Sequence, residues 1–270
     1  MITSRREGLI AALCLAAVIV VLLPYMEFSK GVHLNFYSVS EERQLGEVTA
    51  RRLESRFRLV TEPSIQAYLH QLGTRIASGA NAPGFRFEFR MLDSPEVNAV
   101  ALPGGFIYVT RGLVLEIPNE GELAGVLAHE IAHVLSRHGT KQLSRDRLMG
   151  LVTALGGLAS PLPDIVTNLE RLSYSRGDET RADKLAVGYL YQAGYHPEAL
   201  ASFFELLLRT HSKAGVPQFL LTHPLSTERI AQVRQLFSTW PLDDRLVRNS
   251  ESFHEVQALL RARAAGTQKK

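Results

Sequence analysis

The most constraining feature of this sequence is the run His129-Glu-Ile-Ala-His133, which lies inside a predicted helix. Asn119-Glu-Gly-Glu122 is a typical helix start, and apolar residues recur at helical spacing from there to about Arg137. Residues four apart lie on one helical face, about 6 Å apart along the axis. The two imidazoles can therefore bind one metal ion from the same side.

The residue types in this run are those of a zinc hydrolase. Histidine nitrogens are common zinc ligands, and Glu130 is rotated about 100° from His129, so it falls beside the metal. A carboxylate in that place can take a proton from the attacking water. We therefore expect His129 and His133 to bind one Zn²⁺ per chain, with Glu130 as the catalytic base. Such a short motif also occurs by chance, so a third ligand has to be found.

A later segment supplies the third ligand. The pattern HExxHxxGxxH would need glycine at 136 and histidine at 139, but the chain has Ser136 and Gly139, which excludes that class. Glu179 and Asp183 share a helical face, with Glu179 as the expected ligand and Asp183 as the acceptor of a hydrogen bond from a ligand histidine. The alternative is a solvated charged face, because three basic residues surround the pair: Arg176, Arg181 and Lys184.

Composition bounds the class of protein. The chain has 270 residues, 46% of them hydrophobic and 21% charged, as in an ordinary globular domain with a short appendage. A formal net charge of +3, with no basic stripe, argues against nucleic acid as a partner. The single cysteine, Cys14, excludes an internal disulfide.

The N-terminus carries targeting information. No charged residue lies between Glu7 and Glu27, which is close to the ~20 residues that a membrane-spanning helix needs. Arg5 and Arg6 precede this stretch, so we expect a membrane anchor within residues 1–31 and a catalytic part on the non-cytoplasmic, periplasmic or extracellular side. The alternative is a cleaved signal peptide, which would leave a periplasmic or secreted protein.

Patterns elsewhere predict further elements. Ser38-Val-Ser-Glu41 is a capping box, Pro63 opens a second helix, and phenylalanines alternate with charged residues over 85–90, as in a half-buried strand. A second strand is expected at Phe106–Thr110. The glycine-broken apolar stretch 148–162 is too short to span a membrane and favours a packed connector over a segment that dips into the membrane.

Four blocks of the chain, in order, resemble the HtpX/BepA-type zinc metalloendopeptidases, a gluzincin family that includes the CAAX prenyl proteases. The resemblance extends from about Ser38 to Phe237. The blocks are Asn98-Ala-Val-Ala-Leu-Pro-Gly-Gly, His129-Glu-Ile-Ala-His133, Ser175-Arg-Gly-Asp-Glu-Thr-Arg-Ala-Asp183 and Thr222-His-Pro-Leu-Ser-Thr-Glu-Arg229.

The resemblance implies an α+β fold, a mostly helical zincin-like (gluzincin) metallopeptidase domain with a small sheet and an edge strand at the active site. That domain would occupy residues 32–240, followed by a short C-terminal extension at 241–270. The first block, within the segment Asn98–Thr110, would be the edge strand that binds an extended substrate by main-chain hydrogen bonds. Its expected substrate-binding residues are Asn98, Ala99, Ala101, Gly104 and Gly105, although the glycines are also explained by a tight turn.

The fourth block carries the remaining expected site residues. By resemblance, His223 lies at the active site and Arg229 helps to position it; the alternative for His223 is a turn residue before Pro224. His223 would stabilise the oxyanion, or it would visit the open zinc position and keep the enzyme latent. His138, just after the metal motif, is expected to be a cation at the helix C-terminus rather than a ligand.

The sequence thus predicts a zinc metalloendopeptidase that hydrolyses proteins at or near a membrane, in protein quality control. Its expected partners are protein or peptide substrates, including misfolded membrane or envelope proteins. A zinc aminopeptidase is one alternative, but Ala101–Phe106 lacks a carboxylate to bind a free amine. A non-proteolytic binding or assembly factor is another, against which the intact Glu130 argues.

Overall fold

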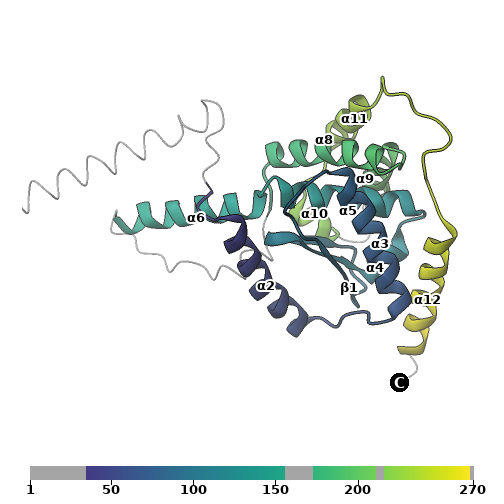
Figure 1. Cartoon of the computed structure of the whole chain (residues 1–270), viewed down its shortest axis with the longest axis horizontal. Coiled ribbons are helices and arrows are strands. Elements are labelled where there is room, and N and C mark those ends of the chain that lie inside the picture. Colours follow the sequence, from purple (N-terminus) through teal and green to yellow (C-terminus); the bar gives the residue numbers. More distant parts are fainter. Residues whose placement is uncertain (1–34, 156–172, 211–215, 268–270) are drawn as a thin grey trace, which may run out of the picture. The chain divides into compact units, whose positions relative to one another are not determined.

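The computed structural model describes residues 35–155, 173–210 and 216–267. Helices dominate it, and its small sheet is formed by residues within 88–110 (Figure 1). The elements are α2 Val39–Arg56, α3 Pro63–Gly79, β1 Glu88–Leu92, β2 Ala99–Leu102, the 3₁₀ turn η1 Pro103–Gly105, β3 Phe106–Thr110, α4 Arg111–Glu116, α5 Glu120–Leu135, α6 His138–Leu155, α8 Arg176–Gln192, α9 Glu198–Thr210, α10 Gln218–Thr222, α11 Thr227–Leu236 and α12 Glu251–Thr267.

The sheet has three strands in the order β1-β3-β2. Strand β3 is central; it pairs in parallel with β1 and antiparallel with β2, with Ile107 opposite Phe89 on one side and Ala101 on the other. All five residues of β3 are buried, as expected for a strand covered on both faces. Strand β2 therefore stands at an edge, and the predicted edge strand is confined to its four residues.

Alternate side chains of the sheet enter two separate apolar clusters. Ile107 and Val109 face the main core with α3 and α5, whereas Phe106 and Tyr108 face α2. Helix α2 covers its face with Ala50 and Leu53, and the Tyr108 hydroxyl donates a 2.5 Å hydrogen bond to the Glu54 carboxylate on the same helix. The sheet is thus a layer between helices, and β2 forms one of its two edges.

Helix α5 is buried along almost its whole length. Every residue from Glu120 to Val134 is buried, including the histidines of the metal motif. Helices α3, α8 and α9 pack around it and the sheet covers another side (Figure 1). Asn119 caps its N-terminus, with the side-chain oxygen accepting a hydrogen bond from the Glu122 N–H at 3.3 Å. A helix enclosed in this way holds its side chains in fixed directions.

The C-terminal helix α12 packs on α3 and α4. Phe253, Val256 and Leu260 enter the main core. The Gln257 amide donates two hydrogen bonds of 2.9 Å, one to a carbonyl in α4 and one to the carbonyl just after that helix. At the start of α5, the buried Glu120 carboxylate accepts hydrogen bonds from the hydroxyls of Tyr68, Tyr195 and Ser250. These contacts bring residues beyond 240 into the same core as the metal motif.

The chain divides into two compact units: residues 39–139 with 166–270, and residues 1–38 with 140–165. In the second unit, the Asn35 side chain donates to the Thr140 hydroxyl at 2.9 Å and the Phe36 N–H donates to the Ser144 hydroxyl at 3.0 Å. The predicted N-terminal segment 1–31 lies outside the described residues. The apolar stretch 148–162 begins inside α6, and its part beyond Leu155 is also outside them. The helices within the described ranges include none that meets the length and hydropathy needed to cross a membrane.

The predicted α+β fold is confirmed, and so are the helices that begin near Ser38, at Pro63 and after Asn119. The strand at Phe106–Thr110 is also as expected. The alternating phenylalanines placed another strand too early: β1 begins at Glu88, and Phe85 and Phe87 precede it while still packing against the core. Of the three alternating phenylalanines, Phe89 alone lies within β1.

Candidate metal centre

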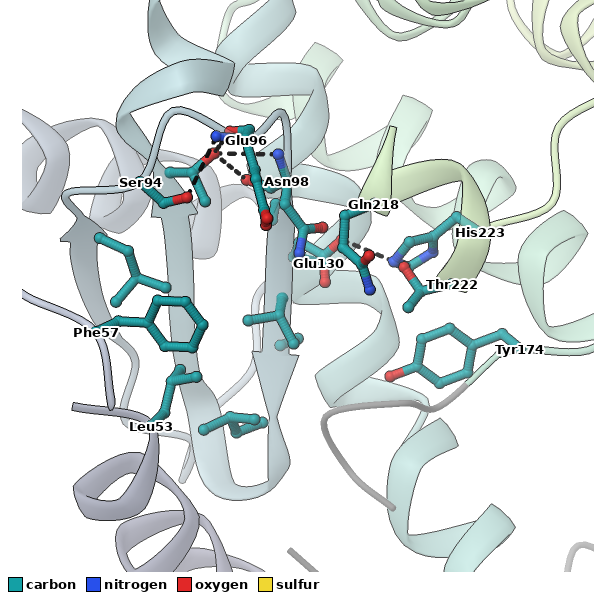
Figure 2. Close-up of a pocket in the computed structure, with 16 residues that line it drawn as sticks. Leu53, Phe57, Ser94, Glu96, Asn98, Glu130, Tyr174, Gln218, Thr222 and His223 are labelled. Atoms are coloured by element: carbon teal, nitrogen blue, oxygen red, sulfur yellow. Dashed lines mark hydrogen bonds and ion pairs between the residues drawn. The ribbon is translucent and has the colours of Figure 1, made fainter. Parts of the chain in front are cut away.

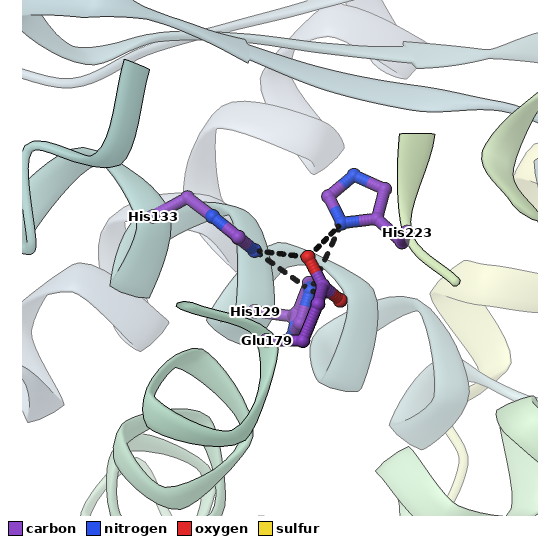
Figure 3. A group of neighbouring side chains, drawn as sticks. All are labelled: His129, His133, Glu179 and His223. Carbon is purple, nitrogen blue, oxygen red and sulfur yellow. Dashed lines mark hydrogen bonds and ion pairs between the residues drawn. The ribbon is translucent and has the colours of Figure 1, made fainter. Parts of the chain in front are cut away.

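Four buried side chains from three parts of the chain meet at one point. The possible ligand atoms of His129, His133, Glu179 and His223 all lie within 4.8 Å of one another (Figure 3). The Nε2 atoms of His129 and His133 are 3.0 Å apart, and Nδ1 of His223 lies 3.3 Å from Nε2 of His129. Glu179 places Oε1 at 3.1 Å from Nδ1 of His223 and 3.4 Å from Nε2 of His133.

Local structure explains how each donor reaches this point. The histidines of α5 lie one turn apart, as their spacing predicted. Glu179 is in the first turn of α8, whose N-terminus is capped by Ser175 accepting a hydrogen bond from the Asp178 N–H at 3.2 Å. His223 is the C-terminal cap of the short helix α10, and its ring stacks on Phe219 with 4.5 Å between centroids.

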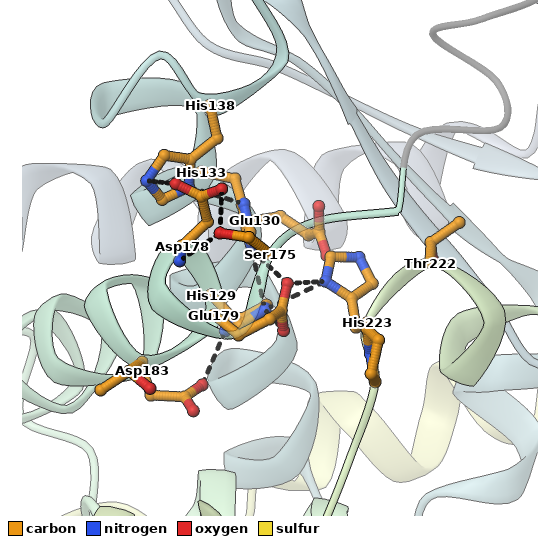
Figure 4. A network of polar contacts seen from close by, with 12 residues as sticks. His129, Glu130, His133, His138, Ser175, Asp178, Glu179, Asp183, Thr222 and His223 are labelled. Carbon is orange, nitrogen blue, oxygen red and sulfur yellow. Dashed lines mark hydrogen bonds and ion pairs between the residues drawn. The ribbon is translucent and has the colours of Figure 1, made fainter. Parts of the chain in front are cut away.

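Arg229 and Asp183 support the cluster from behind. The guanidinium binds the Asp183 carboxylate through Nε at 2.5 Å and Nη2 at 2.9 Å, and its Nη1 lies 2.6 Å from Oε2 of Glu179. Nη1 also donates to the Pro224 carbonyl at 2.9 Å, which fixes the backbone next to His223. Asp183 in turn places Oδ1 3.0 Å from Nδ1 of His129 (Figure 4).

Burial and charge act in opposite directions on these groups. Burial would raise the pKa of the Glu179 carboxyl, but the imidazoles of His223, His129 and His133 hold it well below its usual range. Burial would likewise raise the pKa of Asp183, and Arg229 with His129 lowers it. Both carboxylates therefore stay ionised and can serve a cation. Burial lowers the pKa of His133 well below its usual value, which favours the neutral imidazole that a metal binds.

Glu130 faces a cleft that runs along strand β2. The cleft has a volume of about 310 Å³, and its lining includes Glu130, Asn98, Tyr174 and His223 (Figure 2). Burial raises the pKa of the Glu130 carboxyl, and the nearby imidazoles of His223 and His129 oppose this rise. Nε2 of His223 lies 3.4 Å from Oε1 of Glu130. Glu130 thus lies between the candidate metal ligands and the strand edge.

The predicted substrate-binding residues fall into two groups. Asn98, Ala99 and Ala101 line the cleft, and Oδ1 of Asn98 is buried without a hydrogen-bond partner among the described residues. Gly104 and Gly105 are not among the lining residues. Both have positive φ, 73° and 96°, in the turn between β2 and β3, where an added Cβ would lie 2.5 Å from the Arg43 backbone and 2.2 Å from the Arg86 carbonyl respectively. Their placement favours the tight-turn explanation.

Three polar residues near the centre were not expected from the sequence. Tyr174 lies over His133 with 4.0 Å between ring centroids, and burial raises the pKa of its hydroxyl well above its usual value. Asp178 and His138 lie beside the cluster (Figure 4). The expectation for His138 was wrong in one respect: it does not end α5 but begins α6, and it is buried. The sequence signals were its five-residue spacing from His133 and the position of Asp178 next to Glu179.

Comparison with known proteins agrees with this geometry. The sequence profile described as "Peptidase family M48" matches residues 63–237, from the start of α3 to the end of α11. The chain belongs to peptidase family M48. We class it on this basis as a metallopeptidase, in agreement with the resemblance found in the sequence.

Curated relatives in this family include the Beta-barrel assembly-enhancing protease of Escherichia coli strain K12, which is 31% identical over an alignment of 252 residues; the alignment covers 87% of this chain and 51% of that protein. The Mitochondrial metalloendopeptidase OMA1 of Schizosaccharomyces pombe is 26% identical over 250 residues, 89% of this chain and 73% of that protein. OMA1 of Saccharomyces cerevisiae is 32% identical over 158 residues, 54% of this chain and 46% of that protein. The chain spans about half the length of the first of these relatives.

A stability prediction follows from the position of Arg229 in this M48 site. The substitution Arg229→Met removes the cation that faces two buried carboxylates and leaves both uncompensated. Breaking a buried ion pair in this way costs about 3–5 kcal/mol. We expect the free energy of unfolding of the metal-free protein, measured by denaturant titration, to fall by that amount.

Arg245→Met is the matched control, because Arg245 pairs with Asp243 at the surface, where its side chain is 91% exposed. Its removal should leave stability essentially unchanged. Equal stability of the two variants would show that Arg229 does not compensate the buried carboxylates.

Proposed function

We propose that this chain is a zinc-dependent endopeptidase in which His129, His133 and Glu179 hold the metal. The observation that carries the proposal is the spacing of the donor atoms. Bonds of about 2.0–2.1 Å to a tetrahedral zinc place neighbouring donors about 3.3 Å apart. Five of the six pairwise separations among the four donor side chains range from 3.0 Å to 3.5 Å, with the nearer oxygen of Glu179 taken for each pair. Two neutral nitrogens and a carboxylate are also the donor types that catalytic zinc sites use.

Bound zinc would polarise the scissile carbonyl and lower the pKa of the attacking water. The protein groups do the rest. Glu130 takes the proton from the water and passes it to the leaving amine; its buried position raises the pKa of its carboxyl toward the range useful for a base. Asp183 favours the His129 tautomer that carries its proton on Nδ1, because its Oδ1 lies 3.0 Å from that nitrogen, and Nε2 is then left free to bind.

The substrate class follows from the strand edge. We propose that an extended polypeptide adds to β2 as a further strand and receives its main-chain hydrogen bonds from the Asn98–Leu102 segment. The unpartnered Oδ1 of Asn98 is suited to accept one N–H of that strand. Alternate side chains of the bound strand would face the part of the cleft lined by Leu53 and Phe57, which suits apolar substrate residues.

One observation bears on the aminopeptidase alternative. Glu96 also lines the cleft, so the carboxylate missing from Ala101–Phe106 is available from the preceding loop (Figure 2). A peptide with an acetylated N-terminus separates the two activities, because an enzyme that needs the free amine does not cleave it. We propose the endopeptidase, and expect acetylated and free peptides to be cleaved at similar rates.

The first activity prediction concerns Glu130. The substitution Glu130→Gln preserves the shape of the side chain but removes the proton acceptor, so hydrolysis of casein or an acetylated peptide should be abolished while zinc stays bound. Glu179→Ala is the matched variant: it should lose zinc as well as activity. Metal analysis after dialysis and a cleavage assay on the same samples measure both quantities. Retained cleavage by Glu130→Gln would contradict the base assignment. An inactive wild type would instead reopen the non-proteolytic binding alternative.

A second activity prediction concerns His223. Catalytic zinc sites keep one position open for water, yet His223 Nδ1 stands among the donors as a fourth protein ligand. We propose that this arrangement is latent and that His223 has to move before hydrolysis. His223→Phe should then be more active than the wild type, with unchanged zinc content. If His223 instead stabilises the oxyanion, kcat should fall by roughly 10²–10³, which the same assay detects as an effect of opposite sign.

We also propose that the enzyme acts on membrane or envelope proteins, in quality control, and that residues 1–31 anchor it with the catalytic part outside the cytoplasm. The support is the uncharged stretch after Arg5 and Arg6, together with the names of the relatives, which refer to β-barrel assembly and to mitochondria. The full chain should sediment with membranes after carbonate washing and be digested by protease added from the non-cytoplasmic side. A soluble chain that begins near Val32 would show cleavage of the segment instead.

A further inference from the structure

His138 is a buried histidine that lies next to the metal cluster but outside it. Helix α5 ends at Leu135, and Arg137 then adopts a left-handed conformation with φ of 57°, which turns the chain back and starts α6 at His138. Arg137 Nε binds the Glu42 carboxylate of α2 at 2.8 Å, which holds this turn in place. The His138 side chain is thereby returned to the face of α5 that carries His133. Its surface is only 3% exposed.

The contacts of His138 form a chain of polar groups behind His133 (Figure 4). Nδ1 of His138 lies 2.9 Å from Nδ1 of His133, the ring nitrogen that points away from the cluster. On its other side, Nε2 of His138 lies 3.5 Å from Oδ1 of Asp178. The other oxygen of Asp178 accepts a 2.7 Å hydrogen bond from the hydroxyl of Ser175, the residue that caps α8.

The proton positions in this row of polar groups are fixed once His133 serves as a ligand. A neutral His133 that binds metal through Nε2 carries its proton on Nδ1, so that Nδ1 has to donate to Nδ1 of His138. His138 then carries its own proton on Nε2, which faces the Asp178 carboxylate. Each nitrogen has one complementary neighbour.

We propose that His138 and Asp178 are positioning residues that set the tautomer and ring direction of His133 for the metal. The proposal rests on the assignment of His133 as a zinc ligand under the proposed function, and it adds the groups that hold that ligand.

The two ligand histidines are then supported by different means. His129 contacts the Asp183 carboxylate directly at 3.0 Å, whereas His133 reaches a carboxylate only through a second imidazole. Asp178 is adjacent to Glu179 in the first turn of α8. One turn of helix therefore provides both the third ligand and the end of the support for the second ligand, so any shift of that turn changes both together.

The test compares two substitutions of His138. His138→Leu keeps an apolar side chain of similar size but cannot accept a hydrogen bond, and zinc affinity should fall about 10–100-fold, as is typical when the partner of a ligand histidine is lost. His138→Gln offers a carbonyl oxygen to Nδ1 of His133 and should recover most of that loss. Affinity is measured by competition with a chromophoric chelator at fixed pH and without substrate. The absorption spectrum of the Co²⁺-loaded protein should change in the leucine variant and be restored by glutamine.

Controls separate positioning from general damage to the fold. His196→Leu removes a half-buried histidine outside the cluster and should leave zinc affinity unchanged. A purely structural role for His138 would lower the melting temperature of the metal-free protein in both variants, without recovery of affinity by glutamine; that result would overturn the proposal. So would a leucine variant that binds zinc as tightly as the wild type.

A further variant keeps the proposal testable if His138→Leu does not fold. Asp178→Asn keeps one oxygen for His138 and turns its NH2 toward the Ser175 hydroxyl, which can accept a hydrogen bond. It removes the charge, so it should weaken zinc binding in the same direction and less. Wild-type zinc affinity in the Asp178→Asn variant would count against the proposed positioning role of Asp178. Failure of the wild-type protein to bind zinc would instead overturn the proposed function, which distinguishes the two failures.

Discussion

The site depends on one buried guanidinium. Glu179 and Asp183 bring two ionised carboxylates into the interior, and each buried ion carries a desolvation penalty of several kcal/mol unless it is paired. Arg229 faces both of them and also binds the Pro224 carbonyl. This single side chain therefore joins α11 to α8 and fixes the backbone beside His223. Without Arg229, the two buried carboxylates would lose the cation that they share.

The site has an enclosed side, formed by helix α5, and an open side, formed by the edge of strand β2. Helix α5 is enclosed along nearly its whole length, and aromatic rings pack on its histidines, with Phe204 at 6.1 Å from His129 and Tyr174 at 4.0 Å from His133 between centroids. Strand β2, by contrast, has β3 as its single partner strand among the described residues. Glu130 lies between the two sides, where the enclosed helix determines its direction and the cleft gives access to it.

Much of this arrangement could be predicted from local sequence signals. The cap at Asn119, the four-residue histidine spacing and the Phe106–Thr110 strand are encoded within short windows, and the structure has each of them. The four sequence blocks that carry the family resemblance include Glu179 and His223, and the structure brings both residues to the histidines. The roles of these residues stay predictions. What local patterns could not give was the reversal at Arg137, because a positive φ at a non-glycine residue has no clear sequence signature and depends on its Glu42 partner. His138 was misplaced for that reason.

An open strand edge discriminates by the state of the substrate backbone. In the proposed strand addition, the β2 edge can pair only with a chain whose own N–H and C=O groups are unpaired, and β2 has four residues. A segment already held in a helix or a sheet meets this requirement only after it has come apart. The enzyme would thus select unfolded segments by their free backbone, and the preference for particular side chains would be secondary. Folded proteins in the same compartment would escape cleavage without a separate recognition element.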